Sequence, residues 1–326
     1  MGKNRIAENL IAIIVALASV LLFGPGLAPA FAQQKQKEIV WSADETPIHD
    51  GIHGLRDLSD DQRARTTKDL ALKIRQLPVT ENKLRLAVGL ANLSTEGDFG
   101  HDTLQEVATT LAGALKERPL PWPEMKPGKK KDESSGSKST PASEDANASP
   151  REPAGPYLEL ASLVRYEHVE ASLDDEQYRA AIALLEAADR KREHAQFSLK
   201  DLTGKTWTFS ELRGKVVLMN FWATWCPPCR KEMPDLQALY ERFASQGLVI
   251  LGISDEEANK VKPFIRERKV TFPVLLDPGR KVNEAFEVEG IPKTFIYDRE
   301  GKLVAQSIDM RTREQFLAML AKAGIQ

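Results

Sequence analysis

The sequence predicts an all-α domain followed by an α/β domain, and the boundary between them is a change of pattern near residue 196. Before this point apolar residues recur at helical spacing, whereas after it short apolar runs punctuated by glycine alternate with amphipathic stretches. A chain of 326 residues is also long enough for about two domains, each with its own hydrophobic core. We therefore expect a helical domain first and a sheet flanked by helices after it.

The composition excludes several classes of protein. The 45 Lys and Arg residues are balanced by 47 Asp and Glu residues, so the formal net charge of -2 provides no basic field for nucleic acid. Two cysteines cannot staple a fold, which excludes a disulfide-rich scaffold. Both cysteines lie in one motif, Cys226-Pro227-Pro228-Cys229. We expect no nucleic-acid partner, and we expect the chemistry to lie in this motif.

Residues 1–32 have the three parts of a secretory signal peptide. Basic residues precede an apolar run from Leu10 to Phe23, and an Ala-x-Ala site ends at Ala32. The apolar run of 14 residues is shorter than the roughly 20 that a spanning helix needs. We therefore expect cleavage after Ala32 and export to the periplasm. The alternative is an uncleaved N-terminal anchor in the inner membrane, which would be the chain's membrane contact.

The helical domain is expected in two parts, residues 33–118 and 157–195. The apolar spacing between residues 60 and 116 predicts amphipathic helices, with Thr80 as a candidate N-cap, and helical spacing resumes at residue 157. Between these parts, residues 119–156 form a Pro/Ser/Lys-rich stretch with eight prolines, six serines and no Ile, Val or Phe, which is typical of a disordered linker. We interpret the linker as an insertion in one domain of about five helices, and two separate helical pieces fit the same pattern.

The α/β domain is expected to span residues 196–326. Residues 197–209 suggest a β-hairpin, and residues 216–222 form a nearly continuous apolar run, as in a strand covered on both faces. A helix should begin at Pro227. The remaining expected elements are a strand at 248–254, a helix near 256–268, a strand at 273–276, a short helix at 280–286, two strands at 294–297 and 303–307 that form an antiparallel hairpin, and a helix at 312–323.

The cysteine pair stands where a strand ends and a helix begins. Pro227 suits the first helical position, because its φ angle is already helical and its missing N–H would have no partner there. The unpaired amides and the dipole of a helix N-terminus favour a thiolate on Cys226, since they lower the pKa of a thiol from about 8.5. Cys229 lies inside the helix and should be the more buried of the two. We therefore predict that Cys226 forms a mixed disulfide with the substrate and that Cys229 resolves it.

Three other roles for the cysteine pair compete with disulfide exchange. A zinc site would need two more soft ligands, and no histidine follows Cys226, so we expect neither a metal nor another cofactor. A structural disulfide would gain little chain entropy by closing so short a loop. A peroxidatic cysteine of the peroxiredoxin type also sits at a helix N-terminus and remains a rival interpretation.

Two segments around the motif point to a family. They read FSELRGKVVLMNFWATWCPPCRKEMP from Phe209 and GIPKTF from Gly290. This sequence resembles the TlpA/ResA-like branch of the thioredoxin superfamily over roughly 130 residues. The resemblance implies a thioredoxin-like fold, which is a mixed central sheet flanked by helices, with an inserted segment near residues 255–285. The helical region resembles no family that we can name.

The resemblance also implies roles for residues beside the motif. Pro292 matches the family's cis-proline, which faces the cysteine pair and leaves the backbone at Ile291 free to pair with an extended substrate segment. Trp225, Pro227 and Pro228 would complete the surface that meets the substrate beside the reactive sulfur.

The resemblance further implies that one carboxylic acid accepts and returns protons at the site. Glu232, three residues after Cys229, matches the acidic residue that manages protons in this branch, where it would accept the Cys229 proton. The alternative is an ordinary glutamate on the helix surface. Asn220 stands where ordinary thioredoxins have a buried aspartate, and because asparagine cannot take a proton, the acid/base role moves to Glu232 or to solvent.

The expected function is that of an exported thiol-disulfide oxidoreductase acting on protein thiols and disulfides. The resemblance implies a reductant that is recharged by a membrane electron-donor protein and acts on proteins such as apocytochrome c during cytochrome c maturation. One alternative is a thiol peroxidase of the peroxiredoxin (AhpC/TSA-like) type, although Ala223 stands where such sites carry Thr or Ser. The other is a helical protein-binding module with a vestigial redox site.

Overall fold

Six α-helices precede the first strand in the parts of the chain that the structure, a computed structural model, describes, namely residues 39–124 and 151–325. The predicted signal peptide, residues 1–32, and most of the predicted linker, residues 119–156, lie outside these described residues. The six helices are α1 (Thr46–His53), α2 (Asp60–Gln76), α3 (Glu81–Ser94), α4 (His101–Glu117), α5 (Gly155–Tyr166) and α6 (Glu176–His194).

Side chains before the helices satisfy the first backbone amides. Ser59 and Gln62 form a capping box at the start of α2, and the Thr80 side chain accepts a hydrogen bond from the Lys83 N–H at the start of α3. Asp175 accepts from two amides of the first turn of α6. The predicted N-cap at Thr80 is therefore confirmed.

Helix α1 was not predicted, because its eight residues have only Ile48 and Ile52 as buried positions and so show too short a periodic pattern. The helix expected at residues 157–171 spans Gly155–Tyr166 instead, and His168 adopts a positive φ of 58° beyond its end. The six helices bury a common core, whose fully covered members include Leu55, Ile74, Leu90, Leu111 and Tyr157.

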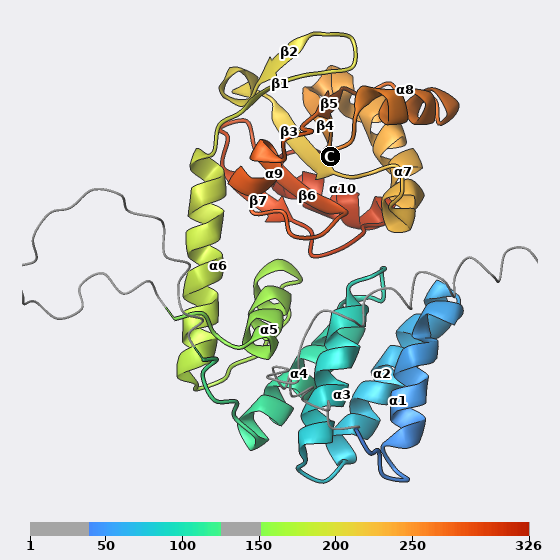
Figure 1. Ribbon diagram of the computed structural model, residues 1–326, viewed down its shortest axis with the longest axis vertical. Helices are drawn as coiled ribbons and strands as arrows, with labels where there is room; N and C mark the ends of the chain where they lie inside the picture. The colour runs from blue at the N-terminus through green and yellow to red at the C-terminus, as the bar shows by residue number, and fades with distance from the viewer. Residues whose placement is uncertain (1–38, 125–150, 326) are drawn as a thin grey trace, which may run out of the picture. The chain divides into compact units, whose positions relative to one another are not determined.

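The C-terminal part has the thioredoxin-like fold that the sequence predicts. Its strands are β1 (Ser198–Lys200), β2 (Thr206–Thr208), β3 (Val216–Phe221), β4 (Leu248–Ser254), β5 (Val274–Leu276), β6 (Lys293–Tyr297) and β7 (Leu303–Gln306), and its helices are α7 (Pro227–Phe243), α8 (Ala258–Glu267), α9 (Lys281–Ala285) and α10 (Arg313–Lys322). Strands β1 and β2 form a hairpin, and the other five form a mixed sheet of order β5-β4-β3-β6-β7. Strand β3 runs parallel to β4 and antiparallel to β6, which is itself antiparallel to β7 (Figure 1).

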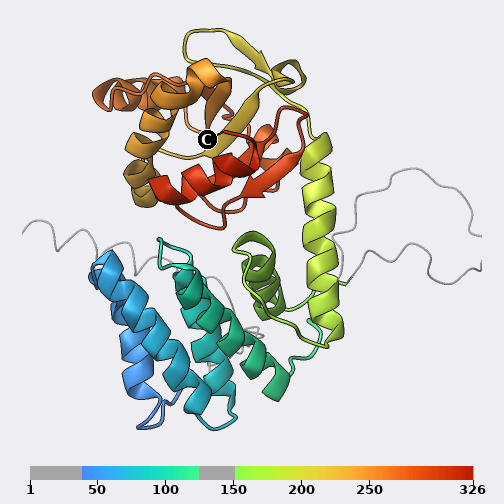
Figure 2. The same cartoon turned by 180° about the vertical axis from the view of Figure 1, so that it is seen from behind.

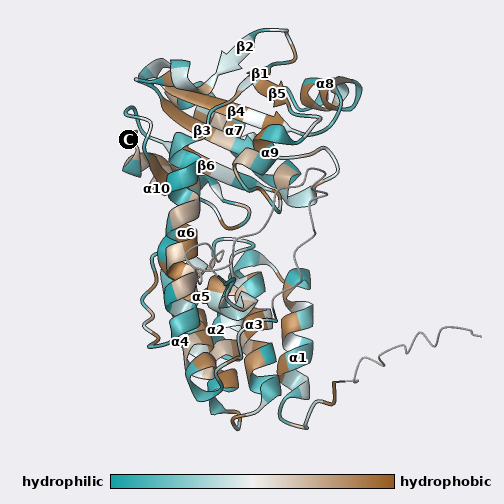
Figure 3. Ribbon diagram, turned by 60° about the vertical axis from the view of Figure 1, so that its left-hand side comes forward, coloured by the Kyte–Doolittle hydropathy of each residue, from teal (hydrophilic) through white to brown (hydrophobic). Residues whose placement is uncertain are grey.

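Both faces of the sheet are covered, as the apolar run of β3 predicts. Val216 and Leu218 pack on the face that α7, α8 and α10 cover, while Val217, Met219 and Phe221 pack on the other face with α9 and the β1–β2 hairpin. Figure 2 shows α10 in front of the sheet, and Figure 3 shows β3 and β4 as hydrophobic along their length. A strand buried on both sides places its carboxyl end, and whatever follows it, at a fixed edge of the sheet.

The last turns of α6 are hydrogen-bonded to the sheet domain. The Arg192 Nε donates to the carbonyl oxygen of Phe286 at 2.9 Å, and the Tyr297 hydroxyl donates to the carbonyl oxygen of Arg192 at 3.1 Å. The Gln306 side chain, on strand β7, donates to Asp189 at 2.7 Å. The described residues from Trp41 onward form a single compact unit. None of the helices in the described ranges has both the length and the apolar character that crossing a membrane requires.

Candidate active site

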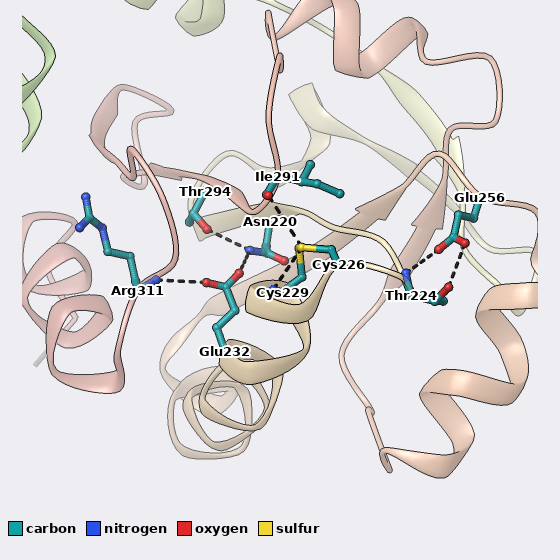
Figure 4. The surroundings of a disulfide bond; sticks show 9 residues. All are labelled: Asn220, Thr224, Cys226, Cys229, Glu232, Glu256, Ile291, Thr294 and Arg311. Atoms are coloured by element: carbon teal, nitrogen blue, oxygen red, sulfur yellow. Dashed lines mark hydrogen bonds between the residues drawn. A yellow bond between two sulfur atoms is a disulfide. The ribbon is translucent and has the colours of Figure 1, made fainter. Parts of the chain in front are cut away.

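A disulfide between Cys226 and Cys229 lies at the N-terminus of α7, directly after the carboxyl end of β3 (Figure 4). Cys226 is the N-cap residue, and its Sγ accepts the backbone N–H of Cys229 at 3.2 Å. Pro227 and Pro228 occupy the first two helical positions, where a missing N–H leaves no intrahelical bond unmade. One helix amide thus donates to one sulfur of the pair, which is an arrangement that stabilises a thiolate on Cys226 after reduction.

The two cysteines are almost equally covered, which corrects one expectation. Cys226 is 2% exposed and Cys229 is 1% exposed, so exposure does not distinguish them in this disulfide form. The reason is that both sulfurs belong to the packed face of α7 among residues such as Trp222 and Met233. Their positions in the helix distinguish them instead, because Cys226 Sγ receives an amide N–H while Cys229 lies within the first turn.

The residues expected to meet the substrate lie around the disulfide. The Trp225 side chain is 66% exposed, and Pro227 and Pro228 are exposed beside it. The Ile291–Pro292 peptide bond is cis, as the resemblance implies, and the Ile291 carbonyl oxygen lies 3.8 Å from Cys226 Sγ. An apolar, exposed rim and an available backbone carbonyl therefore border the same sulfur.

Glu232 is buried below the pair and is not a surface residue. It is 1% exposed, and its carboxylate accepts the side-chain N–H of Asn220 at 2.7 Å and the backbone N–H of Arg311 at 3.2 Å. Burial raises the pKa of Glu232 to about 8, and the two hydrogen bonds together with the Arg311 charge oppose that rise. This carboxyl group can therefore change its protonation state close to neutral pH.

Asn220 connects the central strand with the carboxyl group. Its side-chain nitrogen donates both to Glu232 and to the Thr294 hydroxyl, the latter at 3.0 Å, and Thr294 lies opposite it on β6. Figure 4 draws the Asn220 amide between the Glu232 carboxylate and the disulfide. Asn220 orients this carboxylate and takes no proton itself, which leaves Glu232 as the titratable group of the network.

Glu256 also lies beside the cysteine pair, although none of the sequence motifs includes it. Its carboxylate accepts the backbone N–H of Thr224 at 2.6 Å and the Thr224 hydroxyl at 2.9 Å, two residues before Cys226 (Figure 4). A signal for it existed, because Glu256 follows the end of β4, and the carboxyl ends of the parallel strands β3 and β4 lie at one edge of the sheet. Arg311, which supplies an amide to Glu232, had no comparable signal.

The described residues hold no group of three or more His, Cys, Asp or Glu side chains that could bind a metal ion. His49 and His53, four residues apart on α1, have ring centroids 4.4 Å apart and ring planes tilted by 55°.

The C-terminal part of the chain is similar to known proteins. The AhpC/TSA family model matches residues 191–306. The thiol-disulfide oxidoreductase ResA of Bacillus thuringiensis (strain Al Hakam) is 36% identical over 146 residues, which is 44% of this chain and 84% of that protein. The chain belongs to the ResA-like thiol-disulfide oxidoreductase family. ResA of Bacillus subtilis (strain 168) is 40% identical over 128 residues, which is 39% of this chain and 72% of that protein.

Two solved structures are also similar to part of this chain. A thiol:disulfide interchange protein from Chlorobium tepidum TLS is 30% identical, covers 39% of this chain and 92% of its own, and has a TM-score of 0.37. StoA from Bacillus subtilis is 28% identical, covers 39% of this chain and 96% of its own, and has a TM-score of 0.35. The relatives named thiol-disulfide oxidoreductase show that this ResA-like protein is an enzyme that exchanges thiols and disulfides. Residues 39–190 precede the range that the family model matches.

Proposed function

We propose that this ResA-like enzyme is exported and reduces disulfides of protein substrates, with Cys226 as the nucleophile. The main support is the disulfide at the start of α7, which has a helix amide on Cys226 Sγ and a buried carboxyl group one turn beyond Cys229. The Trp225 rim and the Ile291 carbonyl beside Cys226 suit an extended polypeptide rather than a small molecule.

The proposed reaction starts from the reduced pair. The Cys226 thiolate attacks a substrate disulfide, so that one substrate sulfur leaves as a thiolate and the other is joined to Cys226. Glu232 then accepts the Cys229 proton, and the Cys229 thiolate attacks Cys226 Sγ. The Cys226–Cys229 bond forms, the bond to the substrate breaks, and the second substrate sulfur leaves as a thiolate. The substrate gains two electrons and the enzyme pair loses them.

We further propose that the protein is exported and that it receives its electrons from a membrane protein. The signal sequence at residues 1–32 would direct the chain to the periplasm, with cleavage after Ala32. In an oxidising compartment a reductant needs a supply of electrons, and we assign that supply to a membrane electron-donor protein. Apocytochrome c is the substrate that we propose first, because heme attachment requires a reduced Cys-x-x-Cys-His site.

The proposed reductase function is tested by trapping the mixed disulfide between the enzyme and its substrates. Replacing Cys229 by Ser (Cys229→Ser) leaves the attacking thiol and removes the resolving one, so mixed disulfides between Cys226 and its substrates should accumulate in the periplasm. Non-reducing gels and mass spectrometry of the captured partners identify substrates and donor, and Cys226→Ala is the control that captures none. Absence of mixed disulfides when Cys226 is demonstrably reduced would contradict the mechanism.

The match to the AhpC/TSA family model favours one second candidate, a thiol peroxidase. Ala223 argues against it, because it offers no hydroxyl three residues before Cys226 to bind a peroxide. Hydrogen peroxide consumption in the presence of a thiol reductant separates the two functions. Rapid turnover of peroxide without a protein disulfide would favour the peroxidase.

A further inference from the structure

The connection between β7 and α10, residues 307–312, is anchored in the helical domain. Ile308 packs against the helical core, and Met310 is buried. Between them, Asp309 accepts a hydrogen bond from the hydroxyl of Thr95, the buried residue that ends α3, at 2.6 Å. The course of this connection is therefore fixed in part by helices that lie outside the thioredoxin-like fold.

Arg311 is the residue of this connection that contacts both the helical domain and the active site. Its backbone N–H donates to Glu232 Oε2 at 3.2 Å, and its guanidinium is paired with the carboxylate of Glu167, the C-cap residue of α5 (Figure 4 shows the Arg311 side of this link). The side chains of Arg311 and Glu167 are only 4% and 9% exposed. Backbone and side chain of one residue thus join the proton acceptor to α5.

We propose that Glu167 is a positioning residue for disulfide exchange, because by holding the Arg311 guanidinium it keeps the Arg311 backbone N–H on the Glu232 carboxylate. The inference deepens the proposed function, and it rests on that function for the step in which Glu232 takes the Cys229 proton. It also gives the helical domain a role in the chemistry of a site that contains none of its residues.

The surroundings explain why the link depends on Glu167. A buried guanidinium that loses its carboxylate is strongly destabilised, so Arg311 would move to reach water. Space for that movement exists, because both residues line a cavity of about 380 Å³ together with Tyr166 and Gln315. Movement of the Arg311 side chain would draw its backbone, and hence its N–H, away from Glu232.

The sign of the effect separates positioning from simple electrostatics. The groups that face Glu232 are Asn220 from β3, Arg311 from the connection, and Asp235 from α7 itself. Losing the Arg311 N–H and moving its charge away would disfavour the carboxylate and raise the Glu232 pKa. If Arg311 stayed in place, loss of the Glu167 charge would instead leave the Glu232 pKa unchanged or lower it.

The test is a titration of Glu232 in the oxidised full-length protein. With ¹³C-carboxyl glutamate, the Glu232 resonance is the one lost in Glu232→Gln, and its pKa is read directly by NMR. We expect Glu167→Ala to raise that pKa by about one pH unit. Glu167→Gln, which keeps the side-chain size, should raise it less. Glu170→Ala is the matched control, since Glu170 is exposed and is hydrogen-bonded through its backbone to Gln105.

An unchanged or lowered Glu232 pKa in folded Glu167→Ala, with its disulfide intact, would overturn the inference. If Glu167→Ala does not fold, Glu167→Gln decides in the same way. The titration needs no substrate, so its outcome is independent of whether wild type exchanges disulfides. A second readout is kinetic: the pH profile of mixed-disulfide resolution should shift upward with the Glu232 pKa in Glu167→Ala, and a profile identical to that of wild type would contradict the role in exchange.

Discussion

At the scale of single residues, the proposed chemistry depends on a carboxylic acid that is kept out of water. Glu232 is 1% exposed, yet it has two hydrogen-bond donors, Asn220 and Arg311, that keep its charged form accessible. Without these donors burial alone would hold the acid protonated, and without burial it would be ionised at any pH near neutrality. The balance gives a group that can both accept and return a proton.

The burial of Glu232 predicts how the free energy of unfolding depends on pH. Burial raises the pKa of Glu232 from 4.5 to about 8, so between these values the folded protein binds a proton that the unfolded chain has lost. The contribution of this group to the free energy of unfolding should therefore fall as pH rises, by about 1.4 kcal/mol per pH unit. This pH dependence is measured by urea unfolding of the oxidised wild-type protein and of Glu232→Gln at several pH values between 4.5 and about 8. Parallel curves for wild type and variant would show that Glu232 does not titrate as described.

The contacts of Glu256 predict a second single-residue effect, on stability and on the rate of disulfide exchange. Its carboxylate holds both the N–H and the hydroxyl of Thr224, so Glu256→Ala leaves two polar groups of the turn before Cys226 without their acceptor. We expect a loss of about 2 kcal/mol in the free energy of unfolding and slower disulfide exchange. Glu257→Ala is the control, because Glu257 is exposed and its side chain makes no capping hydrogen bond to α8. Equal effects of the two substitutions would contradict the role of Glu256.

At the scale of elements, we predict that the N-terminus of α7 determines which sulfur reacts. Because Cys226 Sγ accepts a helix amide, the Cys226 thiol should ionise more easily than a free cysteine. In Cys229→Ser we expect its alkylation by iodoacetamide to have a midpoint near pH 7 or below, compared with about 8.5 for the same thiol in the denatured protein. A midpoint at or above the denatured value would mean that the buried acids nearby outweigh the helix.

Some helices and strands can be predicted from their own sequences, whereas others cannot. Strand β3 and helix α7 were predicted at their observed places, because a continuous apolar run and a proline after a candidate cap are local signals. Helix α1 has no such signal, and its packing on α2 and α3 is what makes it a helix. Local patterns do not reveal either Glu256 or Arg311, because they meet the site from segments 30 and 85 residues after Cys226. The signal for Glu256 is its place after β4, and Arg311 has none.

At the scale of the whole molecule, Arg192 joins the helical and sheet domains. It is 7% exposed, its Nε donates to the Phe286 carbonyl, and its own carbonyl accepts the Tyr297 hydroxyl. Arg192→Ala leaves Asp189 without one of its partners, and we expect it to lower the free energy of unfolding by about 3 kcal/mol. Chemical denaturation measures this loss, with Arg190→Ala as the control, because Arg190 is exposed and pairs at 4.0 Å only within α6. A loss no larger than in the control would show that Arg192 does not join the domains.

The sequence by itself determined the thioredoxin-like fold, the family and the cysteine pair, because these depend on residues that are close together along the chain. The tertiary structure alone decided that Glu232 is buried, that Cys226 is as covered as Cys229, and that Arg311 joins the site to Glu167. The physical reason is that burial and hydrogen bonding are properties of surroundings brought together from distant segments, whereas strand and helix patterns are properties of the segment itself.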